Sequence, residues 1–162
     1  MGWLNWLFVD LSRIGADGLV FVVAGAVLAV LWRRPWLFVL VLTADLAADG
    51  LSYVLRQWIG RDRPPLVYPE PKPLVDVPHT GSFPSGHAAT AFACATVLAW
   101  ASPRLRVPAF VLAAGIACSR VYMGVHWPLD ILGGAVLGVA VATALLTLVA
   151  GRPRLLPARP AG

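Results

Sequence analysis

Hydrophobic runs separated by short polar stretches make up most of this 162-residue chain. The runs at residues 36–59, 86–101, 105–122 and 129–150 are each apolar enough to be a helix that crosses a bilayer. A further run, residues 18–32, rises only about 22 Å as a helix against a hydrocarbon core of roughly 30 Å, so it spans only if the helix extends or the bilayer thins. The pattern predicts an all-α integral membrane bundle of about five transmembrane helices.

An amphipathic helix is predicted ahead of these spans, at residues 3–14. Its apolar side chains recur at helical spacing with polar side chains between them, which is typical of a helix that lies in the membrane interface. Trp3 and Trp6 are its expected anchors.

The polar connections set the domain boundaries. Residues 60–84 form a proline-rich loop that is predicted to lack regular structure, and a loop of this length is usually functional or disordered. Residues 1–150 are expected to form a single membrane domain. Residues 151–162 alternate Arg and Pro and are predicted to be a disordered basic tail.

Composition narrows the class of protein. Hydrophobic residues make up 59% of the chain and charged residues 13%, which argues against an ordinary soluble globular domain. The net charge of +5 is carried by scattered arginines. Nucleic acid is therefore not an expected partner, and the edges of a bilayer explain the charge better.

Three polar stretches interrupt the apolar pattern, at residues 56–64, 84–87 and 119–130, and are called the first, second and third polar stretches below. They fall at the end of one span, at the start of the next, and at the junction between the last two. Because consecutive spans alternate in direction, all three are predicted to meet on one face of the membrane.

The cationic residues suggest which face this is. Once Arg56, Arg63 and Arg120 are set aside as site residues, the positive-inside rule predicts a site on the extracytoplasmic face of a cell membrane. The opposite face carries seven arginines and the site face keeps three other cations: Arg33, Arg34, Arg104, Arg106, Arg152, Arg154 and Arg159 against Arg13, Arg61 and Lys72.

The first and third polar stretches supply arginines suited to an anion. Arg56, Arg63 and Arg120 stay charged, and a planar guanidinium can donate two hydrogen bonds to one phosphate. Each one alone is also explained as an interfacial side chain or a topology signal. Together on one face they predict a phosphate site, because fixed cations and backbone N–H groups stabilise the charge of a phosphoryl-transfer transition state.

The second polar stretch, Pro84-Ser85-Gly86-His87, opens a span. Ser85 is a natural N-cap, Gly86 lets a ligand approach the backbone closely, and the first N–H groups of a helix favour an anion. An ordinary capped helix start is the alternative. His87 in the first turn, beside the loop that carries Arg63, favours the phosphate site.

His126 and Asp130 flank the start of the last span. A carboxylate this close can accept a hydrogen bond from one imidazole nitrogen and leave the other as a free lone pair, which gives an oriented base or nucleophile. A capping Asp beside an unrelated His is the alternative. No metal and no cofactor are expected, because the three histidines and few carboxylates show no zinc-ligand spacing.

The three polar stretches together resemble the signature motifs of the type 2 phosphatidic acid phosphatase (PAP2) superfamily, which includes membrane lipid phosphatases and, more distantly, vanadium haloperoxidases. They read Arg56-x6-Arg63-Pro64, Pro84-Ser85-Gly86-His87 and Ser119-Arg120-x5-His126-x3-Asp130, and the resemblance covers roughly residues 36–150. The first motif departs from the family, which usually has Lys where this chain has Arg56. The cation is kept, so phosphate binding is expected to survive.

The resemblance implies a two-step, metal-free hydrolysis. His126 attacks phosphorus to form a phosphohistidine while Asp130 orients its imidazole. His87 protonates the leaving oxygen and then activates the water that hydrolyses the intermediate. The phosphoryl oxygens are held by Arg56, Arg63, Ser85, the Gly86 amide and Arg120.

The substrate implied is a lipid-linked phosphate or diphosphate, and a small chain of this composition looks like bacterial enzymes that recycle undecaprenyl diphosphate for cell-wall synthesis. A phosphatidic acid or phosphatidylglycerophosphate phosphatase is the alternative in the same class. A non-catalytic lipid-phosphate binder or transporter is the alternative in another class, but it does not need His87, His126 and Asp130 together.

Two features of the spans lie outside these motifs. Asp45 and Asp49 are one turn apart within residues 36–59, and a carboxylate at mid-membrane costs roughly 2.5–3.5 kcal/mol on insertion scales, so they are expected to face the bundle interior and to brace Arg56. Gly134-x3-Gly138 is expected to allow close helix packing within the chain.

Overall fold

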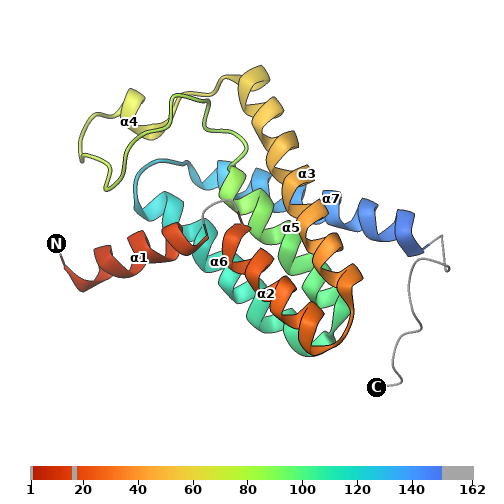
Figure 1. The fold of residues 1–162 in the computed structure, drawn as a ribbon. Coiled ribbons are helices and arrows are strands. Elements are labelled where there is room, and N and C mark those ends of the chain that lie inside the picture. Colours follow the sequence, from red (N-terminus) through yellow and green to blue (C-terminus); the bar gives the residue numbers. More distant parts are fainter. Residues whose placement is uncertain (1, 16–17, 151–162) are drawn as a thin grey trace.

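The computed structural model describes residues 2–15 and 18–150, and every regular element within them is a helix. Each hydrophobic run of the sequence forms one helix (Figure 1), so the all-α prediction is confirmed. The predicted tail at residues 151–162 lies outside the described residues. The elements are α1 (Trp3–Ile14), α2 (Leu19–Leu31), α3 (Pro35–Ile59), α4 (Pro64–Val67), α5 (Gly86–Ala101), η2 (Pro103–Leu105), α6 (Arg106–Tyr122) and α7 (Pro128–Ala150).

Helix α5 is the centre of the bundle. It packs against α3, α6 and α7, and 11 of its 16 residues are buried. Most of the buried residues are alanines, whose small side chains let neighbouring helices approach closely. The second polar stretch leads into the N-terminus of this helix, so the packing brings that stretch to the ends of α3, α6 and α7.

Glycines on α7 make its contact with α5 unusually close. A Cβ on Gly138 would lie 2.2 Å from the carbonyl oxygen of Ala89, and a Cβ on Gly134 would lie 2.4 Å from that of Ser85. The two glycines therefore serve packing within the chain, as predicted. The same contact holds the first turn of α7, because the Ser85 N–H donates to the carbonyl oxygen of Asp130 at 3.0 Å.

The predicted number of five membrane spans is not confirmed. Among the described helices, the segments 35–67, 103–122 and 128–150 are long and apolar enough to cross a membrane, and α1 with α2 adds a fourth if the pair counts as one span bent by 57°. Helix α5 is apolar but, with 16 residues, shorter.

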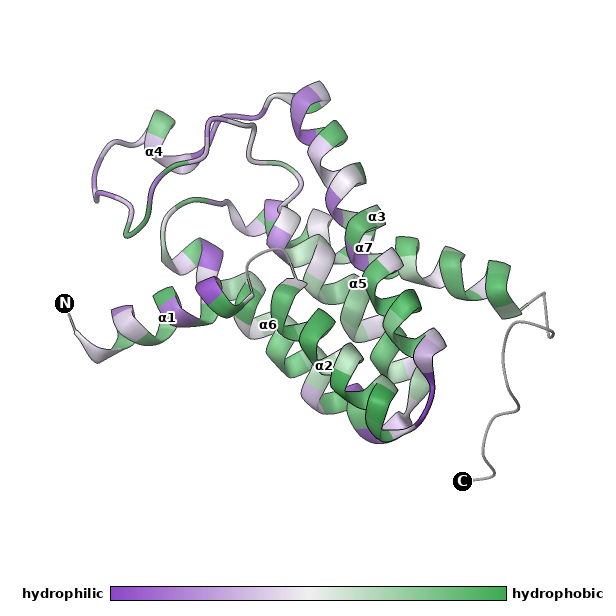
Figure 2. Cartoon of the chain, in the orientation of Figure 1, coloured by the Kyte–Doolittle hydropathy of each residue, from purple (hydrophilic) through white to green (hydrophobic). Residues whose placement is uncertain are grey.

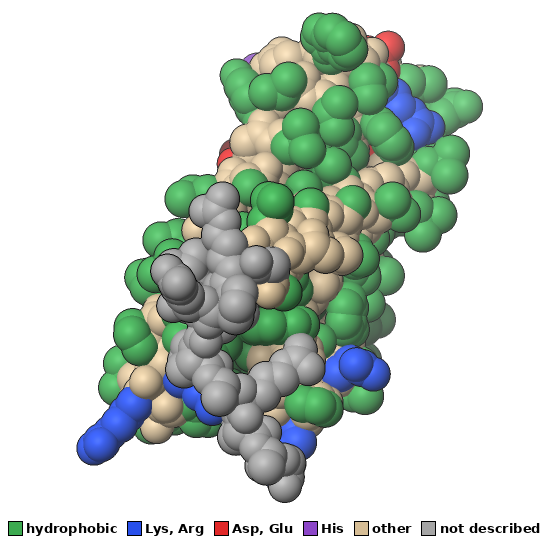
Figure 3. Space-filling model, turned by 90° about the vertical axis from the view of Figure 1, so that its right-hand side faces the viewer, with side chains coloured by type: hydrophobic (Ala, Val, Ile, Leu, Met, Phe, Trp, Pro, Cys, Tyr) green, Lys and Arg blue, Asp and Glu red, His purple; other side chains and the backbone are tan. Residues whose placement is uncertain are grey.

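The surface nevertheless has the distribution expected in a bilayer. Figure 2 shows hydrophobic residues along the outer helices α2 and α7 and hydrophilic residues at the turn between α2 and α3 and in the loop around α4. In Figure 3, hydrophobic side chains spread over much of the visible face, and Lys and Arg side chains lie at its lower end and at its upper right.

Helix α1 extends away from the bundle and contacts only α6 to any extent among the described elements (Figure 1). Its outer side chains Trp3 and Trp6 are 74% and 56% exposed, whereas Val9 and Ser12 are buried. The phenol of Tyr122 in α6 donates to Asn5 Oδ1 at 2.8 Å. The predicted amphipathic helix is confirmed, and its location at the membrane interface stays a prediction.

The connection between α3 and α5 is more ordered than predicted. Pro64 and Pro65 open the short helix α4, since the fixed φ of proline suits a first helical turn. The prediction that residues 60–84 lack regular structure is therefore wrong at residues 64–67. The remainder is irregular but fastened, because Ser82 N–H donates to the carbonyl oxygen of Arg61 at 2.8 Å and Trp127 Nε1 donates to that of Asp62 at 2.9 Å.

We expect Gly138→Val to destabilise the bundle by roughly 1–3 kcal/mol, because the added side chain forces α7 away from the α5 backbone. Thermal unfolding in detergent measures the change. The matched control is Gly50→Ala on α3, where an added Cβ meets nothing within 4 Å. Equal stability of Gly138→Val and the parent chain would contradict the proposed contact.

Candidate active site

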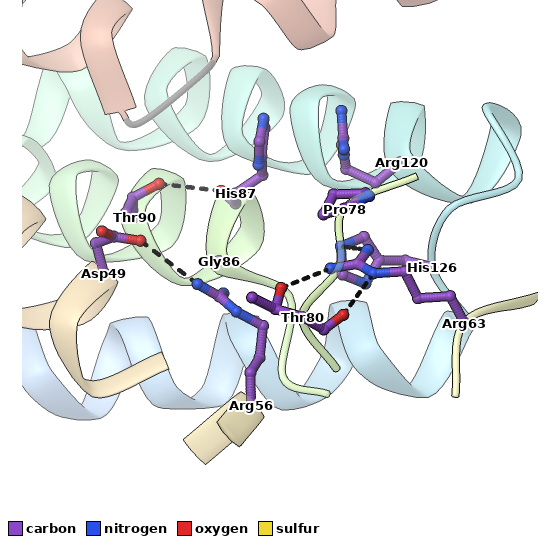
Figure 4. A pocket seen from close by; sticks show the side chains of 10 residues that line it. All are labelled: Asp49, Arg56, Arg63, Pro78, Thr80, Gly86, His87, Thr90, Arg120 and His126. Carbon is purple, nitrogen blue, oxygen red and sulfur yellow. Dashed lines mark hydrogen bonds and ion pairs between the residues drawn. The ribbon is translucent and has the colours of Figure 1, made fainter. Parts of the chain in front are cut away.

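All three polar stretches line one small pocket at the end of the bundle (Figure 4). Its volume is about 140 Å³, below the roughly 300–1,000 Å³ of pockets that enclose a drug-sized ligand. It therefore has room for a head group but not for a lipid. The lining residues come from α3, the 60–84 loop, α5, α6 and the α6–α7 connection: Asp49, Arg56, Arg63, Pro78, Thr80, Gly86, His87, Thr90, Arg120 and His126.

Arg63 is held rigidly by main-chain oxygens. Its side chain donates to the carbonyl oxygens of Thr80 at 2.9 Å, Gly81 at 3.1 Å and Val125 at 2.9 Å. Its Nη1 also lies 3.2 Å from Nε2 of His126. The residue is only 2% exposed, so the guanidinium is fixed beside the imidazole before any ligand arrives.

Arg56 reaches the pocket from the last turns of α3. Its Nη1 donates to Ser52 Oγ at 3.0 Å, and its Nη2 lies 3.9 Å from Oδ1 of Asp49. A Cβ on Gly86 would lie 2.4 Å from Arg56 Nη1. Gly86 is therefore needed for the guanidinium to lie over the start of α5, close to the first N–H groups of that helix.

The expected brace of Arg56 comes from Asp49. Asp45 lies deeper in the bundle, where it is 5% exposed and the thiol of Cys94 donates to its Oδ1 at 3.7 Å. Both carboxylates thus face the interior or the pocket rather than the outer surface of α3, as expected of membrane carboxylates.

Arg120 is fastened by a residue that the sequence pattern does not single out. It is 7% exposed, and its Nη1 donates to Oγ of Ser12 on α1. The Nε of Arg120 has no hydrogen-bond partner among the described residues. Ser12 is separated from Arg120 by 108 positions, so only the docking of α1 on α6 reveals the pair.

The pocket carries excess positive charge. Within the described part of the chain, neither Arg63 nor Arg120 has a carboxylate within ion-pair distance, and Asp49 is the carboxylate that faces Arg56. Buried cations that are bound mainly by neutral oxygens favour an anionic ligand, because the ligand supplies the missing counter-charge.

His126 lies between this charge and a buried carboxylate. Its Nδ1 is 3.4 Å from Oδ2 of Asp130, which is fully buried, and its Nε2 faces Arg63. Arg63 can only donate, so Nε2 accepts and Nδ1 carries the proton that faces Asp130. Burial lowers the pKa of His126, the hydrogen bond to Asp130 opposes that change, and the charges of Arg63 and Arg120 lower the pKa further.

His87 lies in the first turn of α5 and lines the same pocket as His126. Its ring makes no hydrogen bond to another described residue, whereas its carbonyl oxygen accepts from Thr90 Oγ1 at 3.3 Å (Figure 4). The ring is thus available to a ligand. The structure brings the two histidines to a common pocket together with Arg56, Arg63 and Arg120.

Ser85 differs from the prediction. It occupies the N-cap position of α5, but its side chain makes no capping hydrogen bond, and its buried Oγ has no partner among the described residues. It is also absent from the pocket lining. The backbone of Ser85 is used instead, since its N–H donates to the carbonyl oxygen of Asp130.

Arg61 is the second residue that the motif spacing does not single out. Its Nη1 donates to Oδ1 of Asp130 at 2.9 Å across 69 positions of sequence. Across residues 2–15 and 18–150, no group of three or more His, Cys, Asp or Glu side chains is arranged to hold a metal ion. Independence of a metal stays a prediction.

Comparison with known proteins identifies relatives of the chain. A sequence model of the PAP2 superfamily matches residues 34–154. Phosphatidylglycerophosphatase B of Bacillus subtilis (strain 168) is 32% identical over 151 residues, which cover 85% of this chain and 71% of that protein. Undecaprenyl-diphosphatase of Sulfolobus acidocaldarius is 33% identical over 141 residues, which cover 83% of this chain and 66% of that protein.

The fold has a close counterpart as well. The crystal structure of a transmembrane PAP2 type phosphatidylglycerolphosphate phosphatase from Bacillus subtilis matches with a TM-score of 0.75 and 29% sequence identity. The match covers 96% of this chain and 81% of that one.

We expect the His126 ring to titrate below its ordinary value of 6.5, because burial and two nearby guanidinium groups disfavour the imidazolium. The neutral ring, with a lone pair on Nε2, is therefore the main form at pH 7. Nuclear magnetic resonance of protein labelled with ¹⁵N in its three histidines measures this titration, and His126→Ala assigns the signal. Titration of His126 above 6.5 would contradict the described environment.

Proposed function

The chain belongs to the PAP2 superfamily and is a membrane phosphoric ester hydrolase, and we propose that it hydrolyses a lipid-linked phosphate or diphosphate through a phosphohistidine formed at His126, without a metal ion. The observation that carries the proposal is the pocket itself. It combines three guanidinium groups with two imidazoles, and one of those imidazoles has its Nε2 lone pair directed away from an orienting carboxylate.

The first step uses His126 as nucleophile. Its Nε2 lone pair forms a bond to phosphorus while the bond from phosphorus to the leaving oxygen breaks, and His87 gives its proton to that oxygen. The imidazole becomes positive as the bond forms, and the carboxylate of Asp130 stabilises it through Nδ1–H.

The second step regenerates the enzyme. His87, now neutral, takes a proton from water as the water oxygen attacks phosphorus, and the N–P bond breaks to release inorganic phosphate. In both steps the charge on the equatorial oxygens is stabilised by Arg56, Arg63 and Arg120 and by the free N–H groups at the start of α5. We propose that Ser85 supports these phosphate-binding groups through its backbone N–H, which holds the start of α7 by its hydrogen bond to the carbonyl oxygen of Asp130.

Undecaprenyl diphosphate is the substrate we propose first. The 33% identity to an undecaprenyl-diphosphatase supports it, and so does a pocket too small to enclose more than a head group. Phosphatidylglycerophosphate is a second candidate, favoured by the likeness to a phosphatidylglycerophosphatase and to the structure of a phosphatidylglycerolphosphate phosphatase. We also propose that the pocket faces the extracytoplasmic side, because four of the seven described cations outside the site, Arg33, Arg34, Arg104 and Arg106, lie at the opposite end of the spans.

We expect purified protein to release phosphate from undecaprenyl diphosphate faster than from undecaprenyl phosphate, phosphatidic acid or phosphatidylglycerophosphate. Release is expected to persist in EDTA, to be blocked by vanadate, and to fall by roughly 10³-fold or more in His126→Ala. A phosphate-release assay measures all four results. The matched control is His79→Ala, since His79 is exposed on the loop.

Full activity of His126→Ala would remove the proposed nucleophile, and strong inhibition by EDTA would indicate a metal-dependent reaction. Binding of lipid phosphate without turnover, by a folded protein, would indicate a non-catalytic binder instead. A preference for phosphatidylglycerophosphate would leave the chemistry in place and overturn the first choice of substrate.

The role of His87 has its own test, based on the leaving group. An alkoxide must be protonated as it leaves, so we expect His87→Ala to slow hydrolysis of phosphatidic acid by roughly 10²–10⁴-fold. The comparison uses kcat/KM, which reports formation of the phosphohistidine and not the second step, where His87 acts on both substrates alike. The loss in kcat/KM is expected to be much smaller with p-nitrophenyl phosphate, whose nitrophenolate leaves without a proton. Equal losses of kcat/KM on the two substrates would contradict a general acid at this position.

A further inference from the structure

Arg61 is a cation of the first polar stretch that does not contribute to the pocket. It occupies one of the six unspecified positions between Arg56 and Arg63, and it is absent from the pocket lining. It points instead to Asp130, with Nη1 to Oδ1 at 2.9 Å, and its side chain is 36% exposed whereas that of Asp130 is fully buried. To bind phosphate, the side chain of Arg61 would have to point into the pocket instead of toward Asp130.

The carboxylate of Asp130 divides its two oxygens between different partners. Oδ2 accepts from the Trp127 N–H at 2.8 Å and lies 3.4 Å from Nδ1 of His126. Oδ1 accepts from Arg61. Because each oxygen is bound on its own side, the plane of the carboxylate is fixed with Oδ2 toward the imidazole.

We propose that Arg61 is a positioning residue for the nucleophile, which acts by holding the Asp130 carboxylate so that Asp130 holds His126 in the tautomer with its lone pair on Nε2. The inference rests on the proposed function, in which His126 attacks phosphorus. It adds a third member to the pair of His126 and Asp130, and it gives a role to a position that the family motif leaves open.

The physical reason is the burial of the Asp130 charge. A buried carboxylate without a cation is strongly disfavoured, and it avoids that cost by taking up a proton or by turning toward another donor. Either change weakens the hydrogen bond to Nδ1–H of His126. The charge-assisted hydrogen bond from Arg61 compensates the negative charge at Oδ1, on the side remote from the imidazole, so Oδ2, which also accepts from the Trp127 N–H, stays directed toward His126.

A purely structural role for Arg61 is the competing explanation. Its guanidinium also lies 5.6 Å from the ring of Trp127, so it helps to fasten the loop onto the α6–α7 connection. Loosening that loop would move Arg63, which belongs to the phosphate-binding group, and would raise KM. Loss of a positioning contact to the nucleophile instead lowers kcat with KM little changed.

The kinetic test compares Arg61→Gln in two backgrounds. In the parent chain we expect kcat to fall by about 10- to 100-fold with KM nearly unchanged, and Arg61→Lys to recover part of the loss. In an Asp130→Asn background, the same substitution is expected to change kcat by less than about 2-fold, because the group through which Arg61 acts is gone. The matched control is Ser82→Ala, which removes a loop hydrogen bond to the Asp62 carbonyl oxygen without touching Asp130.

A fall in kcat of the same size in both backgrounds would overturn the proposal, as would a rise in KM shared by Arg61→Gln and Ser82→Ala.

A spectroscopic measurement separates this inference from the proposed function. In ¹⁵N-histidine spectra, His126 is expected to be the Nδ1–H tautomer in the parent chain and a mixture of tautomers in Arg61→Gln. An unchanged His126 spectrum in folded Arg61→Gln overturns the positioning role. If the parent chain hydrolyses no lipid phosphate but the tautomer shifts, the proposed function fails and the positioning role stands.

Discussion

The site depends on one electrostatic constraint, which is the burial of guanidinium groups at the end of an apolar bundle with few carboxylates to neutralise them. Arg63 is compensated by the carbonyl oxygens of Thr80, Gly81 and Val125, which orient it without removing its charge. The guanidinium of Arg120 is oriented in the same way by the hydroxyl of Ser12, which also leaves its charge in place. A phosphoryl group supplies the missing negative charge. The guanidinium groups stabilise it most in the transition state, where the charge on its oxygens increases.

The packing of the bundle makes that concentration of charge possible. The alanines of α5 and the glycines of α7 allow the two backbones to touch, and this fixes the start of α5 against the start of α7. Gly86 leaves room for Arg56 over the first turn of α5. Small residues therefore determine how close cations, imidazoles and free N–H groups come, whereas larger side chains at these positions would hold them apart.

Local patterns predicted most of the fold and which residues meet at the candidate site. The hydrophobic runs specified the helices, and the order of the polar stretches specified which helix ends meet. The contacts of Ser12 and Arg61 were not predicted, because their partners lie 108 and 69 positions away and no local pattern encodes such a contact. Ser85 is the opposite case, since its residue type and position predict a capping hydroxyl, but that hydroxyl is buried without a hydrogen-bond partner among the described residues. The count of five spans is not confirmed because α2 and α5, with 13 and 16 residues, are shorter than a helix that crosses a typical hydrocarbon core.

A structure of the protein with bound vanadate shows whether His126 is the nucleophile in an arginine-lined pocket, because a five-coordinate vanadate imitates the phosphoryl group during transfer. We expect vanadium bonded to Nε2 of His126, equatorial oxygens contacted by Arg56, Arg63 and Arg120, and the oxygen opposite His126 beside His87. Vanadate held by the arginines alone, with Nε2 of His126 directed elsewhere, would contradict His126 as the nucleophile.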